Sequence, residues 1–117
     1  MKILKCKVTD PKDTPTRAHP GDAGLDLKAA KNALLYPGDR QAVDTGVCVE
    51  VAKGYVGLLC ARSGKALQSG LGIANGVGVI DSGYRGPVKV LLINHGGKQI
   101  EISRGDRIAQ LLIVPIE

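Results

Sequence analysis

The sequence contains no phenylalanine and no tryptophan, and its aromatic residues are three tyrosines, Tyr36, Tyr55 and Tyr84. The hydrophobic core therefore has to be built from Val, Ile, Leu and Ala side chains. So few rings do not favour a platform on which the bases of single-stranded nucleic acid stack. The sequence also has no run close to the roughly 20 apolar residues that a membrane-spanning helix needs, so no membrane partner is expected.

Cysteines are few and are not arranged as a motif. Cys6, Cys48 and Cys60 are odd in number and show no C-x-x-C spacing, which argues against a disulfide framework or a zinc site. Residues 1–7 alternate lysine with apolar residues and lack the continuous apolar stretch of a signal peptide. These features predict reduced thiols in a cytoplasmic protein.

Positive charge is in excess, with 16 Lys and Arg against 11 Asp and Glu, a formal net charge of +5. This excess favours an anionic partner such as a phosphate ligand or a nucleic acid. The basic residues are spread along the chain rather than clustered, so we expect no nucleic-acid partner. The two histidines, His19 and His95, lie far apart in loop-like segments and do not predict a metal site.

A length of 117 residues predicts a single domain, residues 1–117. Sixteen glycines and six prolines separate short segments in which polar and apolar residues alternate. That periodicity predicts β-strands and an all-β sandwich or barrel. The one plausible helix is short, around residues 65–68. The expected strands are residues 2–8, 25–30, 33–36, 41–51, 55–62, 76–80, 87–94, 99–103 and 107–116.

Four polar motifs follow or interrupt apolar strands. Residues 23–27 read Ala-Gly-Leu-Asp-Leu, residues 61–64 read Ala-Arg-Ser-Gly, residues 75–86 contain the turn Asp-Ser-Gly, and residues 105–110 read Gly-Asp-Arg-Ile-Ala-Gln. Each motif alone has an ordinary structural explanation, such as a turn, the solvated face of a strand or a surface cation.

In this order and spacing, however, the motifs resemble the trimeric all-β dUTPase family, from about residue 23 to residue 115. The resemblance includes the thirteen-residue step from Arg62 to Asn75 and the six-residue step from Asn75 to Asp81. It implies a distorted, jelly-roll-like β-barrel that assembles as a homotrimer with sites shared between subunits. It also implies hydrolysis of dUTP to dUMP and pyrophosphate, by attack of water on the α-phosphorus with Mg²⁺ as cofactor.

The resemblance assigns roles to individual residues. Asp81 matches the carboxylate that activates water, and Asp26 matches a position that acts on Mg²⁺ indirectly, through a bound water. The backbone of the base pocket can match the alternating acceptors and donor of uracil, and the ring of Tyr84 leaves no room for a 2′-hydroxyl. The residues matched to phosphate binding are Arg62, Ser63, Gly64 and Gln110, and those matched to base and sugar binding are Asn75, Gly78, Val79, Ile80, Tyr84 and Lys89.

The sequence departs from the family pattern at several points. Ala61 stands where the family usually has proline, and Lys65 stands where an apolar residue is common; we expect Lys65 to point to solvent rather than to phosphate. Asp106 and Arg107 are expected to have a structural role. The family carries a glycine-rich tail with an aromatic residue after the last strand, whereas this sequence ends at Glu117. We therefore expect weaker activity, or a sequence that stops before the tail.

Three other functions each fit a part of the sequence. A catalytically weak or inactive dUTPase-like trimer that senses nucleotides or binds a partner would account for the missing tail. A dCTP deaminase shares the fold but needs a glutamate in the strand after the Asp-Ser-Gly turn, and residues 88–93 read Val-Lys-Val-Leu-Leu-Ile. A barrel that binds nucleic acid has only the net charge in its favour. Hydrolysis of dUTP is therefore the preferred function.

Overall fold

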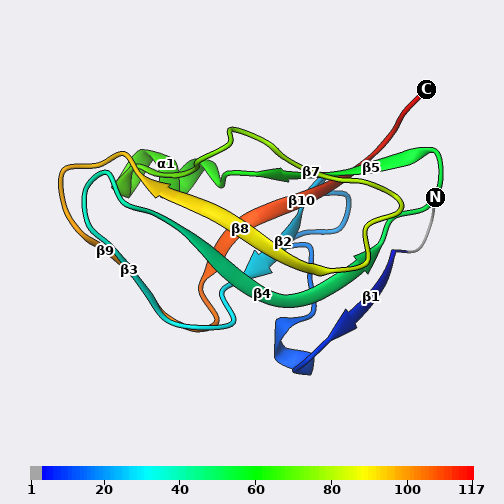
Figure 1. Cartoon of the computed structure of the whole chain (residues 1–117), viewed down its shortest axis with the longest axis horizontal. Helices are drawn as coiled ribbons and strands as arrows, with labels where there is room; N and C mark the ends of the chain where they lie inside the picture. The colour runs from blue at the N-terminus through cyan, green and yellow to red at the C-terminus, as the bar shows by residue number, and fades with distance from the viewer. Residues whose placement is uncertain (1–3) are drawn as a thin grey trace.

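The computed structural model describes residues 4–117 as an assembly of short antiparallel strands with one α-helix and one 3-10 helix (Figure 1). The elements are β1 (Lys5–Val8), η1 (Pro11–Asp13), β2 (Leu25–Lys28), β3 (Ala33–Leu35), β4 (Arg40–Glu50), β5 (Tyr55–Cys60), α1 (Ser63–Ser69), β6 (Leu71–Ile73), β7 (Gly78–Ile80), β8 (Pro87–Asn94), β9 (Ile100–Ile102) and β10 (Arg107–Pro115). No helix within residues 4–117 is long and apolar enough to cross a membrane.

Two four-stranded sheets and a two-stranded ribbon make up the fold. One sheet has the order β1-β4-β8-β6, the other has the order β2-β10-β5-β7, and β3 pairs with β9. All of these pairings are antiparallel, and most neighbours in a sheet are far apart in sequence. The predicted all-β, jelly-roll-like architecture is confirmed.

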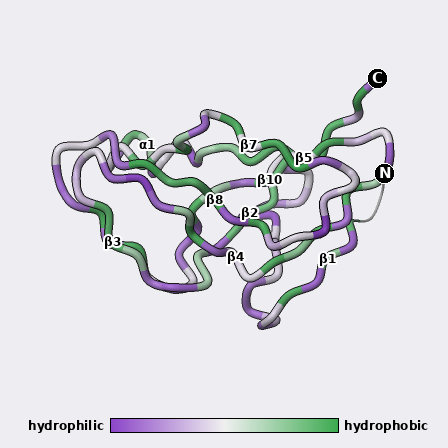
Figure 2. Tube along the Cα trace, viewed as in Figure 1, coloured by the Kyte–Doolittle hydropathy of each residue, from purple (hydrophilic) through white to green (hydrophobic). Residues whose placement is uncertain are grey.

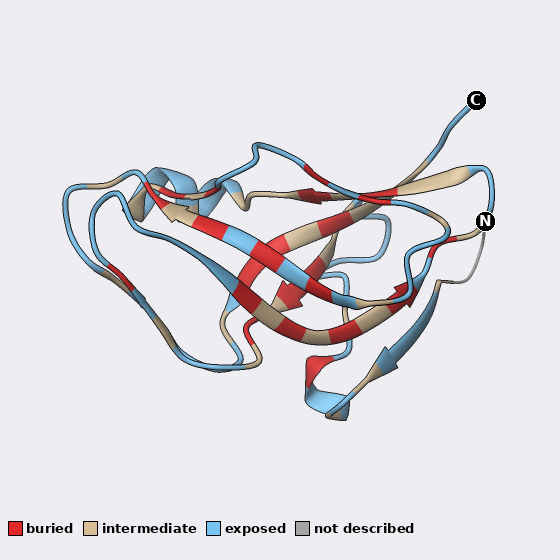
Figure 3. Ribbon diagram, in the orientation of Figure 1, coloured by how far each residue is buried: buried red, intermediate tan, exposed pale blue. Residues whose placement is uncertain are grey.

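The core is aliphatic and lies between the two large sheets. Val43, Val47 and Val49 on β4 are buried at alternate positions, as the sequence pattern predicted. Figure 3 shows the same alternation of buried and exposed residues along β8, and in Figure 2 the hydrophobic segments follow the strands whereas the loops are mostly hydrophilic. Leu27 and Leu111 close the core from the second sheet, and both are fully buried.

The N-terminal segment is joined to the turn between β9 and β10 by one arginine. The Arg104 guanidinium forms ion pairs of 3.1 Å with Asp10 and of 3.1 Å with Asp13, and the carboxylate of Asp13 is buried. The backbone N–H of Lys12 and the nearby Arg104 together hold the pKa of Asp10 below its ordinary value, and Asp13 raises the pKa of Arg104. These ion pairs attach the loop that precedes β2 to the turn between β9 and β10.

Most expected strands are present with shorter ends. Residues 2 and 3 of the expected first strand lie outside the described residues, and the strand expected from residue 76 begins at Gly78 because Gly76 has a left-handed φ of 76°. The helix expected around residues 65–68 extends over Ser63–Ser69. Strand β6, which is only three residues long, and the 3-10 helix η1 were not expected from the sequence.

Gly46 generates a testable prediction about packing. Its φ of 70° is left-handed, and a Cβ at this position would lie 2.6 Å from Oδ2 of Asp13. We expect Gly46→Ala to lower the free energy of unfolding by about 2–4 kcal/mol, because backbone strain and a collision with a buried carboxylate add together. The measurement is chemical denaturation at a fixed protein concentration.

The matched control is Gly38→Ala. Gly38 also has a left-handed φ, 84°, but a Cβ there would meet no atom within 4 Å. This variant should lose only about 1 kcal/mol, the contribution of backbone strain. Equal losses in the two variants would show that the contact with Asp13 contributes nothing to the effect.

Candidate functional site

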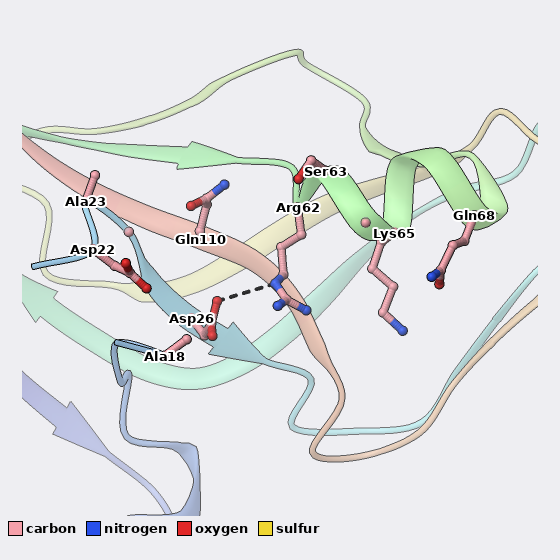
Figure 4. Close-up of a pocket in the computed structure, with 11 residues that line it drawn as sticks. Ala18, Asp22, Ala23, Asp26, Arg62, Ser63, Lys65, Gln68 and Gln110 are labelled. Carbon is pink, nitrogen blue, oxygen red and sulfur yellow. Dashed lines mark ion pairs between the residues drawn. The ribbon is translucent and has the colours of Figure 1, made fainter. Parts of the chain in front are cut away.

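The predicted site residues fall into two separate clefts. The first, called here the Arg62 cleft, has a volume of about 500 Å³ and is lined among others by Asp26, Arg62, Ser63, Gly64, Lys65 and Gln110 (Figure 4). The second, called the Tyr84 cleft, has a volume of about 410 Å³ and is lined among others by Asn75, Gly78, Val79, Ile80, Tyr84 and Lys89. The two clefts share no lining residue. All predicted residues except Asp81 therefore line one cleft or the other.

A buried carboxylate between two arginines forms the floor of the Arg62 cleft. Asp26 on β2 is buried, and its Oδ1 lies 3.4 Å from Nε of Arg62 while its Oδ2 lies 3.7 Å from Nε of Arg107. The two guanidinium groups compensate the charge of the carboxylate, which burial would otherwise make costly. The cluster presents the partly exposed guanidinium of Arg62 to the cleft.

Gln110 is held by a hydrogen bond of its amide nitrogen and by the pairing of β10. It lies opposite Asp26 of β2 and opposite Cys60 of β5. Its Nε2 donates a hydrogen bond of 3.0 Å to the carbonyl of Ala61, and its Oε1 lies where a Cβ of Gly24 would stand. Gly24 is therefore required at this position for Gln110 to lie across the cleft.

Helix α1 supplies the opposite wall. Arg62 precedes its first residue in an extended conformation, so the chain turns sharply and leaves Ser63 and Gly64 at the start of the helix, exposed to the cleft. The helix ends at Gly70, whose left-handed φ of 78° allows its N–H to reach the carbonyl of Ala66. A hydroxyl and backbone N–H groups near an arginine are suitable donors for phosphate oxygens.

The Tyr84 cleft is mixed in character. The Tyr84 hydroxyl donates a 2.7 Å hydrogen bond to the carbonyl of Pro87, which holds the ring at the mouth of the cleft. Val79 and Leu91 present exposed apolar side chains, and the Asn75 side chain is a polar group at the rim. A cleft with an aromatic ring, apolar walls and a single amide can accept a flat heterocycle with polar edges.

Asp81 lines neither cleft. It follows β7 directly and is exposed, and its backbone carbonyl accepts a 3.0 Å hydrogen bond from the N–H of Tyr84. This bond closes the tight turn that the Asp-Ser-Gly sequence predicted. The structure thus brings the residues predicted to bind phosphate together with Asp26, and it brings the residues predicted to bind the base and sugar together with Tyr84. It does not bring the two groups together around Asp81 within one chain.

Three further residues were considered in the sequence. Lys65, which was expected to point to solvent, is partly buried and lines the open Arg62 cleft. Arg107 was expected to have a structural role, and its Nε lies 3.7 Å from the carboxylate of Asp26. Its neighbour Asp106 does have a structural role, because its Oδ2 accepts a hydrogen bond of 2.9 Å from the N–H of Ser103. No local sequence signal identifies this contact of Arg107, because in a regular strand residues three apart, such as Arg107 and Gln110, point to opposite faces.

The residues of the Arg62 cleft do not by themselves supply enough ligands to hold a metal ion, so further ligands such as water or phosphate oxygens would be needed. Within residues 4–117 no group of three or more His, Cys, Asp or Glu side chains is placed to hold a metal ion. Asp26 is a single carboxylate, and two arginines already lie against its oxygens. Mg²⁺ keeps several waters and is often held mainly by the phosphates of a substrate, so Asp26 fits a role through a metal-bound water and not as the core of a protein cage.

Comparison with known proteins gives consistent results. The family model described as dUTPase matches residues 10–117. A deoxyuridine 5'-triphosphate nucleotidohydrolase of Nocardia farcinica is 53% identical over 104 residues, a match that covers 88% of this chain and 63% of that protein. The chain thus spans less than two thirds of the length of this relative.

Solved structures agree with the sequence match. A variant of the dUTPase from phage phi11 of Staphylococcus aureus, described with a structural Mg(II) ion, has a TM-score of 0.89 and 30% identity; the match covers 98% of this chain and 92% of that one. A variant of the Staphylococcus bacteriophage 80alpha dUTPase with dUpNHpp has a TM-score of 0.91 and 30% identity, covering 100% of this chain and 85% of that one. On the family match over residues 10–117 and the 53% identity to a curated relative, the chain belongs to the dUTPase family.

Proposed function

We propose that this chain forms the catalytic domain of a dUTP diphosphatase, which hydrolyses dUTP to dUMP and pyrophosphate. The observation that carries the proposal is the division of the predicted residues between two clefts of complementary chemistry. The Arg62 cleft offers cations and hydrogen-bond donors suited to phosphates, and the Tyr84 cleft offers an amide, a ring and strand backbone suited to a nucleoside.

In the Arg62 cleft, Arg62, Ser63, Gly64 and Gln110 would bind the triphosphate. The guanidinium of Arg62 can donate two parallel hydrogen bonds to phosphate oxygens, and the Ser63 hydroxyl and the backbone at Gly64 add further donors. The Gln110 amide lies in the same cleft, and the hydrogen bond to Ala61 uses only one of its two N–H donors, so the other can be donated to these oxygens.

In the Tyr84 cleft, the strand backbone from Gly78 to Ile80 would recognise uracil. The N–H and C=O groups of an extended strand alternate, as do the polar groups on the edge of the base, and the Asn75 amide adds one donor and one acceptor. Cytosine would leave some of these groups unpaired, which disfavours it by orders of magnitude. The ring of Tyr84 would pack on the deoxyribose, and Lys89 would contact the nucleotide from β8.

Asp81 would act as the general base. Its carboxylate accepts a proton from a water molecule as the water oxygen attacks the α-phosphorus. The bond between the α-phosphorus and the oxygen that bridges to the β-phosphorus breaks, and pyrophosphate leaves with that oxygen. The exposed position of Asp81 at the end of β7 allows it to reach a substrate that is not enclosed by its own chain.

Mg²⁺ would be held by the phosphates and by waters, one of which contacts Asp26. Its chemical contribution would be positive charge that offsets the charge on the phosphate oxygens. The structural Mg(II) ion of the related phage phi11 dUTPase supports a role for this ion in the family. In this chain the ion pairs with Arg62 and Arg107 orient the carboxylate of Asp26, so that it can hold such a water.

A homotrimer would complete the site. The two clefts share no residue and Asp81 lines neither, so a complete arrangement requires residues from another copy of the chain. The exposed apolar side chains of Val79 and Leu91 beside the Tyr84 cleft support burial against another subunit. The three free thiols support a reducing, cytoplasmic location.

The role of Asp81 can be tested by Asp81→Asn. The amide cannot accept the proton of the attacking water, so turnover of dUTP should fall by about 10²–10⁴-fold while nucleotide binding persists. Pyrophosphate release with Mg²⁺ measures the first quantity and calorimetry with a non-hydrolysable dUTP analogue measures the second. Glu101→Gln, an exposed acid on β9, is the matched control and should keep full turnover.

Turnover that survives in Asp81→Asn would contradict the assignment of the general base. A wild-type protein that binds dUTP but releases no pyrophosphate would contradict the proposed activity. That result would instead favour the nucleotide-sensing trimer.

The role of the Tyr84 ring can be tested by comparing two variants. Tyr84→Ala removes the ring and should reduce the preference for dUTP over UTP by about tenfold or more, because space opens for a 2′-hydroxyl. Tyr84→Phe keeps the ring and loses only the hydrogen bond to Pro87, so it should retain most of the preference. The ratio of kcat/KM for the two nucleotides is the measurement, and an unchanged ratio in Tyr84→Ala would overturn this role.

The placement of Gln110 can be tested through Gly24. Gly24→Ala forces a Cβ into the position of Oε1 of Gln110 and should raise the KM for dUTP and lower the stability by about 1–3 kcal/mol. In a Gln110→Ala background most of that stability loss should disappear, because the side chain that collides is gone. Gly97→Ala, where a Cβ meets nothing within 4 Å, is the control. Equal stability losses in both backgrounds would show that Gln110 is not what Gly24 accommodates.

A further inference from the structure

Helix α1 directs two side chains into the Arg62 cleft, and Arg62 itself enters the cleft from the extended residue just before the helix. Lys65 and Gln68 both line this cleft, and Figure 4 shows their side chains extending to the same side of the helix. Residues three apart lie on one face of a helix, which accounts for the shared direction of Lys65 and Gln68. On the other side, Leu67 is 89% exposed. Lys65 is therefore placed in the cleft by the helix itself.

Among the cations of this cleft, Lys65 is the one without a counter-ion. The guanidinium of Arg62 lies 3.4 Å from the carboxylate of Asp26. Asp22, the other acid of the cleft, accepts hydrogen bonds at its Oδ2 from the backbone and the ring of His19. Within residues 4–117 the ammonium group of Lys65 has neither an ion pair nor a hydrogen bond, and only its backbone carbonyl is engaged, by the Ser69 hydroxyl.

The side chain of Lys65 is also partly buried. Figure 4 shows its side chain extending from the helix on the side of the cleft. An ammonium group with no counter-ion beside it attracts the negative charge of a phosphate. The position, the free charge and the partial burial all point to an anionic ligand.

We propose that Lys65 is a phosphate-binding residue, which contacts the part of the triphosphate that leaves as pyrophosphate. This inference rests on the proposed hydrolysis of dUTP. It adds a cation that the family pattern, with an apolar residue common at this position, does not provide. Because Lys65 lies one helical turn beyond Arg62, it extends the phosphate-binding surface along α1 away from the floor at Asp26.

The test compares Lys65→Met with Lys98→Met, which removes the same charge from an exposed position in the turn before β9. Lys65→Met should raise the KM for dUTP and the inhibition constant of pyrophosphate about tenfold, the loss of one charge-assisted hydrogen bond. The kcat and the inhibition constant of dUMP, which lacks these phosphates, should not change. Lys65→Arg should restore the inhibition constant of pyrophosphate to its wild-type value. Lys98→Met should have the same KM for dUTP and the same inhibition constants as the wild type.

An unchanged pyrophosphate constant in Lys65→Met would overturn the proposal. An equal loss of affinity for pyrophosphate and for dUMP would also overturn it, because the substitution would then act on the whole site. If the wild type shows no turnover of dUTP, the proposed function fails, and calorimetry with pyrophosphate still decides the role of Lys65. Equal dissociation constants for the wild type and Lys65→Met in that measurement would rule out the contact.

Discussion

The pairing of β10 with two partner strands is the constraint on which the rest of the Arg62 cleft depends. The register shifts between Arg107 and Ala109, so one extra residue enters β10 opposite β2. In a regular strand, residues three apart point to opposite faces. The shift lets Arg107 and Gln110 both lie on the side of Asp26, while Ile108 and Ala109 are both buried. A slip by one residue would remove Gln110 from the cleft and expose core residues.

The sequence made the fold class and the longer strands predictable, because their periodicity spans many residues. The alternating valines of β4 and the buried positions of β8 form a period-2 pattern that only a half-buried strand explains. Strand β6 carries no such pattern, since it has three residues with Gly72 in the middle. It forms because its backbone pairs with β8, a long-range contact that no local signal announces.

The site was predictable as a set of residues but not as an arrangement. The motif spacing grouped the residues that line each cleft, including Gln110, which lies far from Arg62 in sequence. The contact between Arg107 and Asp26 depends on the irregular register of β10, and the direction of Lys65 depends on where α1 begins. The separation of Asp81 from both clefts could be expected only from the shared sites that the resemblance implied. In each of these cases the missing information was tertiary geometry rather than residue type.

Helix α1 contributes no buried residue to the core, and it is fixed mainly at its two ends, by the turn at Arg62 and by the left-handed Gly70. Substitutions along its length therefore cost little packing energy, in contrast to substitutions on β4 or β8. Side chains on this helix, beside the residues predicted to bind phosphate, can for this reason be replaced without unfolding the barrel. A single mutation on this helix can therefore change the affinity for a ligand in the cleft at little cost to the stability of the barrel.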